Sequence, residues 1–170
     1  ISGGAQINSS TFGFGRGGSV TVHGLVSPAD SIVIHGSGSG IFTETQGSGA
    51  GGNILVNANT VTLQNGGTLS AKTSGTETTA TGGSITVKTT DHVIMTGEAS
   101  ITASSAGPAD AGNISINAGQ QLDIMGNSSV KTEAKQARGG NIDIQAIDRV
   151  RLANSTISTS VLGGAGGGGN

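Results

Sequence analysis

A short segment recurs along this chain: two small residues, then Asn or Ser, then a triplet with aliphatic residues at its first and third positions. The copies are 17–22 (GGSVTV), 51–56 (GGNILV), 82–87 (GGSITV), 111–116 (AGNISI) and 139–144 (GGNIDI), and a sixth begins at 168–170. From one Asn or Ser to the next, the spacings are 34, 31, 29, 28 and 29 residues. Periods of this length are typical of stacked-repeat proteins, in which one unit cannot bury its apolar face alone.

Two further strand-like segments lie between successive copies. The second segment occurs at 32–34, 61–63, 93–95, 122–124 and 150–152, and the turn-forming or amide residues before it are Asp30, Asn59, Asp91, Gln120 and Asp148. The third segment is centred on Ile7, Ile41, Leu69, Ile101, Val130 and Ile157. Alternation with a period of two predicts that the outer members of each triplet point inward and the middle member outward.

The repeat therefore predicts an all-β fold, a right-handed parallel β-helix (solenoid) with about three short strands per coil and about five coils of 28–34 residues. A solenoid of helices is the competing architecture, but no stretch of about ten residues has helical spacing. Gly and β-branched residues at this density also oppose helices.

The repeats extend over residues 1–170, so we expect a single β-solenoid segment. Residues 1–7 match 63–69, and the last residue is the Asn of a new copy. We therefore expect the segment to begin and end within a repeat, as an excerpt of a longer array. Its expected neighbours are flanking coils of the same chain or identical copies stacked end to end.

The composition suits many thin layers better than one thick core. The 170 residues include 32 Gly and no Cys, Trp or Tyr, and only 11% are charged. Regular alternation of Ile, Val and Leu argues against disorder. The net charge of −2 provides no basic surface, and no apolar run approaches the roughly 18 residues of a membrane span, so we expect neither nucleic acid binding nor membrane insertion.

The Asn or Ser after the two small residues forms a column along the stacked coils. We expect a structural ladder there, in which amides and hydroxyls satisfy backbone groups at a corner of each coil. Its members are Ser19, Asn53, Ser84, Asn113, Asn141 and Asn170.

Short motifs for cofactors and metals lack their required context. Residues 13–18 (GFGRGG) match a dinucleotide-binding pattern, but a strand follows them instead of a helix. The glycine run 163–169 lacks the Asp of calcium-binding repeats, and Asp30, Asp91 and Asp148 alternate with amides, which favours turn capping. No metal-ligand spacing joins His23, His35 and His92. We therefore predict no catalytic, cofactor-binding or metal-ligating residues and no cofactor.

A carbohydrate-acting β-helix enzyme, a polysaccharide lyase or glycosidase, is the alternative function. Such an enzyme needs clustered carboxylates, and the candidates here are Asp123, Asp143, Arg149 and Arg151, on different faces. Without Trp and Tyr, the chain also lacks the aromatic side chains on which sugar rings commonly stack. We therefore expect that the chain is not an enzyme. Asp123 and Arg151 fall in register on neighbouring coils, and we expect an ion pair between them.

The repeat combines the motif Gly-Gly-Asn-Ile-x-Ile/Val, a Val-x-Leu strand, the segment Gly-Gly-Ala-Gln-Ile or Ser-Ser-Val/Ile, and a Gly-rich return. This combination resembles the repeats of filamentous haemagglutinin-like exoproteins of Gram-negative bacteria and cyanobacteria. The resemblance covers essentially all of residues 1–170. It implies two-partner secretion through an outer-membrane partner and an adhesive or filament-forming role outside the cell or on its surface, and leaves open which host or glycan ligand is bound. The expected function is a non-catalytic structural or adhesive solenoid that forms a rigid stalk or filament.

Overall fold

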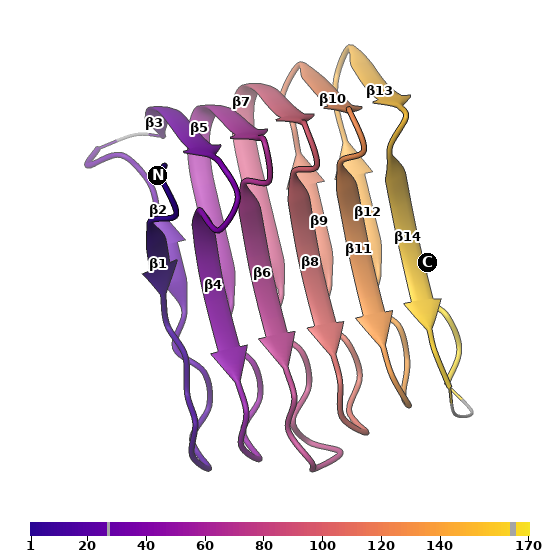
Figure 1. Ribbon diagram of the computed structural model, residues 1–170. Helices are drawn as coiled ribbons and strands as arrows, with labels where there is room; N and C mark the ends of the chain where they lie inside the picture. The colour runs from indigo at the N-terminus through magenta and orange to yellow at the C-terminus, as the bar shows by residue number, and fades with distance from the viewer. Residues whose placement is uncertain (27, 164–165) are drawn as a thin grey trace.

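The chain winds into a solenoid of about five turns, stacked in parallel along one axis (Figure 1). The computed structural model describes residues 1–26, 28–163 and 166–170, and the regular elements in this part of the chain are all strands. The prediction of an all-β, parallel solenoid is confirmed.

Two parallel sheets run along the solenoid. The six-stranded sheet has the order β1 (Gln6–Asn8), β4 (Gly40–Thr45), β6 (Thr68–Thr73), β8 (Ser100–Ser105), β11 (Ser129–Ala134) and β14 (Thr156–Val161). The eight-stranded sheet contains β2 (Val20–Val22), β3 (Ala29–His35), β5 (Ile54–Gln64), β7 (Ile85–Thr96), β9 (Ile114–Asn117), β10 (Gln121–Met125), β12 (Ile142–Gln145) and β13 (Arg149–Ala153). The predicted third segment forms the first sheet, and the first and second segments together form the other.

The corner between the first and second segments differs from the expected turn in two coils. In β5 and β7 the strand passes through the corner without interruption, over 11 and 12 residues. The register shifts there, because Ala58 is opposite Thr89 while Thr60 is opposite His92, so β7 contains one extra residue. A β-bulge of this kind bends a strand without ending it, and the turn residues Asn59 and Asp91 therefore lie inside strands.

The inward positions form a continuous apolar core, as the alternation predicts. Ile54 and Val56 are 1% and 0% exposed, whereas Leu55 between them is half-buried. Equivalent side chains stack from coil to coil in columns of fully buried residues: Ile34, Leu63, Met95 and Ile124 in the eight-stranded sheet, and Ile41, Leu69, Ile101 and Val130 in the other. Each coil thus covers the apolar layer of the next.

The second glycine of each repeat lies directly against the backbone of the preceding coil. A Cβ atom added to Gly52, Gly83 or Gly112 would be 1.9 Å from a carbonyl oxygen, that of Gly18, Gly52 or Gly83 respectively. For Gly140 the corresponding distance, to the Gly112 oxygen, is 1.8 Å. These contacts are far shorter than any real carbon–oxygen contact, so glycine is required at this position for the coils to approach one another.

We expect Gly83→Ala to lower the free energy of unfolding by about 3 kcal/mol, because the new methyl group must push two coils apart against their interstrand hydrogen bonds. Urea denaturation followed by circular dichroism measures this change. The matched control is Gly13→Ala, since a Cβ there has no heavy atom within 4 Å, and its stability should change by less than about 1 kcal/mol. Equal stabilities of the two variants would contradict this explanation of the repeat.

The turn between the second and third segments uses left-handed backbone. Gly66, Glu98 and Asn127 have φ values of 87°, 65° and 62°. They are equivalent residues, because Gln64 is opposite Thr96 and Ile124 is opposite Met95 in the preceding strands. Backbone bonds continue through the turn, where the Gly66 N–H donates to the Gly97 carbonyl and the Glu98 N–H to the Gly126 carbonyl, each at 2.8 Å. Gly and Asn tolerate this conformation, whereas Glu does not favour it.

Glu98→Asn is therefore expected to stabilise the protein by about 0.5–1 kcal/mol, by relieving part of the left-handed strain of roughly 1–2 kcal/mol. The urea midpoint measures the gain. Glu98→Gln removes the same charge but keeps a long side chain in the same backbone conformation, and should leave the midpoint unchanged. A similar gain in both variants would identify charge, and not backbone strain, as the cause.

Candidate functional site

The ladder residues are joined by one side-chain hydrogen bond per step. In each pair, the side-chain oxygen of one residue accepts the backbone N–H of the ladder residue in the next coil. The distance is 2.8–3.1 Å where the acceptor is Asn53, Asn113 or Asn141, and 3.4 Å where it is Ser19 or Ser84. The amide side chain is longer than the serine hydroxymethyl group, so it reaches the next coil more closely.

The ladder also bonds in the opposite direction through its backbone. The carbonyls of Asn53, Ser84, Asn113, Asn141 and Asn170 each accept, at 2.9 Å, the N–H of the first residue of the strand one coil earlier. The side chains remain on the surface, where Ser84 is half-buried and the others are exposed. The ladder residues therefore hold successive coils together at an exposed edge.

Inside the solenoid, threonines bind the carbonyl of the close-packed glycine. The Oγ1 atoms of Thr43, Thr132 and Thr159 donate to the carbonyls of Gly52, Gly140 and Gly169 at 2.7, 2.7 and 2.8 Å. The equivalent residues of β6 and β8 are Ala71 and Ala103, which lack a hydroxyl. The sequence analysis missed these bonds, because a threonine within a strand gives no indication that its hydroxyl has an inward partner.

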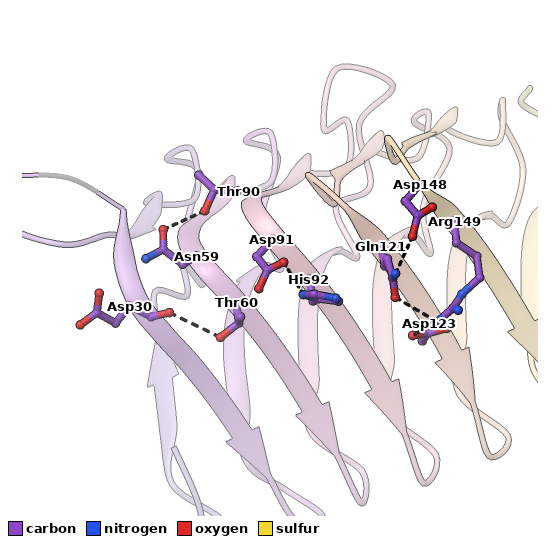
Figure 2. Close-up of polar contacts among 10 residues, drawn as sticks. All are labelled: Asp30, Asn59, Thr60, Thr90, Asp91, His92, Gln121, Asp123, Asp148 and Arg149. Atoms are coloured by element: carbon purple, nitrogen blue, oxygen red, sulfur yellow. Dashed lines mark hydrogen bonds and ion pairs between the residues drawn. The ribbon is translucent and has the colours of Figure 1, made fainter.

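We call the residues at the corner before the second segment, Asp30, Asn59, Asp91, Gln120 and Asp148, the corner column. It contains the acidic side chains considered for metal binding (Figure 2). Thr90 Oγ1 donates to Asn59 Oδ1 at 2.8 Å, and Gln121 Nε2 donates to Asp148 Oδ2 at 2.6 Å. The Asp91 carboxylate contacts His92 Nδ1 at 2.6 Å within the same strand. Asn59 and Asp148 therefore bond to side chains of the neighbouring coil, and Asp91 to the next residue of its own strand. No group of three or more His, Cys, Asp or Glu in the described residues could hold a metal ion.

The predicted ion pair between Asp123 and Arg151 is wrong. The two residues are directly opposite each other in β10 and β13, but Arg149 Nη2 lies 3.1 Å from Asp123 Oδ2. Arg149 Nη2 also donates to Oε1 of Gln121, the residue opposite it, at 3.0 Å (Figure 2). Arg149 is long enough to reach its diagonal neighbour Asp123 as well as Gln121, the residue opposite it. One guanidinium therefore bridges two side chains of the preceding coil.

The structure does not assemble the carboxylates considered for catalysis. Asp143 lies on β12, which pairs with β9, and its Oδ2 accepts a bond from Gln145 at 3.0 Å. Asp123 lies on β10 beside Arg149. Among the described residues, no hydrogen bond or ion pair joins Asp143 to Asp123, Arg149 or Arg151.

The histidines and the glycine-rich motifs are separate from one another. His23 Nδ1 is 2.5 Å from the Gly24 carbonyl oxygen, and His35 Nε2 is 2.9 Å from the Asn65 side-chain nitrogen. Residues 13–18 form a loop that leads into β2. Two members of the glycine run 163–169, residues 164 and 165, lie outside the described residues.

A polar hollow of about 410 Å³ lies beside the ladder, between the return loops of adjacent coils. Its charged side chains are Asp110 and Arg138, and Asp110 Oδ1 accepts the backbone N–H of Arg138 at 2.9 Å.

The described residues contain no helix with the length and hydropathy needed to cross a membrane.

The outward side of the six-stranded sheet is dominated by hydroxyl groups. We call the outward positions of β4, β6, β8, β11 and β14 the hydroxyl face. Its hydroxyl residues are Thr68, Ser70, Ser100, Thr102, Ser104, Ser129, Thr156, Ser158 and Ser160, and its charged residues are Glu44, Lys72, Lys131 and Glu133. The sequence analysis did not identify this face, although the alternation in residues 100–104 and 156–160 reveals it.

We expect Asn113→Ala to lower the free energy of unfolding by about 0.5–1.5 kcal/mol, because the Asn141 N–H loses its acceptor. Asn113→Ser keeps an oxygen in the place that Ser84 occupies one coil earlier, so its loss should be smaller. Urea denaturation of both variants measures the difference. If Ala and Ser have the same effect, the ladder bond does not contribute to stability.

No protein-family model, curated protein sequence or solved structure matches this chain. The functional argument therefore depends on the sequence pattern and the geometry of the solenoid.

Proposed function

We propose that this chain is a non-catalytic structural segment of a bacterial cell-surface protein, a rigid stalk or filament whose loops make adhesive contacts. The observation that carries the proposal is that every coil is bonded to its neighbours in several places around the turn. Both sheets, the ladder and the stacked turns contribute these bonds. Such continuous bonding resists bending and local unfolding, as a stalk requires.

The loops support the adhesive part of the proposal. Phe14 is 91% exposed in the loop before β2, and Leu25 is 99% exposed in the loop before β3. Phe12 and Val26, in the same two loops, are also exposed, at 71% and 94%. Each loop therefore presents two large apolar side chains, and grouped apolar residues are typical of surfaces that contact other molecules. The return loops before the close-packed glycines, within 74–81, 106–110 and 135–138, also gather at one edge of the solenoid (Figure 1), outside the stacked strands.

Location and export follow from the resemblance to filamentous haemagglutinin-like exoproteins. We propose secretion through an outer-membrane partner and display on the bacterial surface. A glycan or host surface is the ligand class that fits an adhesive loop edge.

Antibodies raised against the chain are expected to label intact source cells in immunoelectron microscopy, at a distance from the outer membrane. A matched control uses antibodies against a cytoplasmic protein of the same cells, which should label permeabilised cells only. Labelling that requires permeabilisation would contradict the proposed location. Loss of the outer-membrane secretion partner should abolish the surface label.

The enzymatic alternative is tested separately with the purified chain. Incubation with a panel of acidic and neutral polysaccharides is expected to release no new chain ends. Cleavage that is lost in Asp143→Asn or Asp123→Asn would replace the structural proposal with a carbohydrate-acting enzyme.

A further inference from the structure

The hydroxyl face is a broad and nearly flat surface. Figure 1 shows β4, β6, β8, β11 and β14 side by side, and their pairings are in register over all six residues of each strand. The outward side chains of β8 are Ser100, Thr102 and Ser104, all short. The one aromatic residue, Phe42, lies against Gly40, where a Cβ atom would be 2.7 Å from the ring. Small side chains allow a second sheet to approach to the usual separation of about 10 Å.

Among the described residues, the charges on this face form no ion pair, although Glu44 is directly opposite Lys72 in the adjacent strand. The two ion pairs among the described residues are His92–Asp91 and Arg149–Asp123, both on the other sheet. Lys72 and Glu133 occupy the same outward column, and each is opposite Ser104, one on either side of β8. A positive and a negative charge are therefore placed symmetrically about a central strand.

This placement is self-complementary under one particular two-fold rotation. The axis is parallel to the strands and passes over β8. Rotation by 180° about it reverses the order of the coils, but each outward column of one copy faces the same column of the other. It sets Lys72 of one copy opposite Glu133 of a second copy, and Glu133 opposite Lys72. An axis along the solenoid through the central column would instead place Lys131 opposite Lys131, which like-charge repulsion disfavours.

We propose that the hydroxyl face binds a second copy of this chain, with the two solenoids running in opposite directions and their β8 strands lying parallel, one over the other, on either side of the two-fold axis. Two Lys72–Glu133 pairs fix the register, and the hydroxyl columns pack between them. The five strands, about 4.8 Å apart and six residues long at about 3.3 Å per residue, cover roughly 480 Å² per copy. The sum for both copies, about 1,000 Å², is at the lower limit for specific interfaces, so the dimer is weak and dependent on concentration.

Analytical ultracentrifugation of the chain over a range of concentrations tests the proposal. The wild type is expected to form dimers and no larger species. K72E and E133K each place like charges opposite one another twice, and should raise the dissociation constant about tenfold or more. The double variant K72E/E133K restores both pairs with their signs exchanged and should recover the wild-type constant.

The control is K88E, which makes the same charge change at an exposed position of β7 on the other sheet. It should leave the dissociation constant unchanged, and circular dichroism should show that all variants retain the fold. A monomer at every concentration, a dimer insensitive to K72E, or a double variant that does not recover would each overturn the proposal. So would open-ended oligomers, which indicate end-to-end stacking. None of these results affects the proposed surface stalk, which immunoelectron microscopy tests independently.

Discussion

The structure depends on the close contact between the backbones of adjacent coils at the second glycine of each repeat. The Gly52 carbonyl oxygen occupies the space where a Cβ of Gly83 would be, and the Gly112 oxygen does the same for Gly140. This contact brings the coils to hydrogen-bonding separation along one edge. Once they are at that separation, the same axial step repeats around the turn, and both parallel sheets can form in register.

A constant axial step also explains why side chains form ladders. A residue in one coil lies directly over its equivalent in the previous coil, so any side chain with an acceptor of suitable length can bond to the next backbone N–H. Asn113 does so at 2.8 Å and Ser84 at 3.4 Å. The corner column contains similar bonds between coils, because the Asn59 side chain accepts from Thr90 and the Asp148 side chain accepts from Gln121.

The exposed surface of the loops differs in character from that of the hydroxyl face. The loops accept insertions and exposed apolar residues such as Phe14 and Leu25, since they lie outside the stacked strands. The hydroxyl face has short side chains and symmetrically placed charges instead. The stalk function and the proposed lateral pairing therefore use different parts of the same repeat.

Much of the fold could be predicted from the sequence because the repeat encodes it directly. The alternation in 54–56 places Ile54 and Val56 in the core, and the recurrence of the Asn and Ser residues every 28–34 residues identifies the positions that form the ladder. Details of corners and side-chain reach could not be predicted in this way. The sequence analysis expected turns at Asn59 and Asp91, but the tertiary structure has a bulge that bends β5 and β7 without ending them.

The candidate surfaces could likewise be predicted from the sequence only in part. The sequence alone determined which residues point inward or outward and which are equivalent between coils, because both follow from a period of two within a strand and a period of about thirty along the chain. Only the tertiary structure decided that Arg149, not Arg151, binds Asp123, and that Lys72 and Glu133 are placed symmetrically about β8 on one flat face. These features depend on diagonal distances between coils and on the pairing of whole sheets, which a linear pattern does not contain.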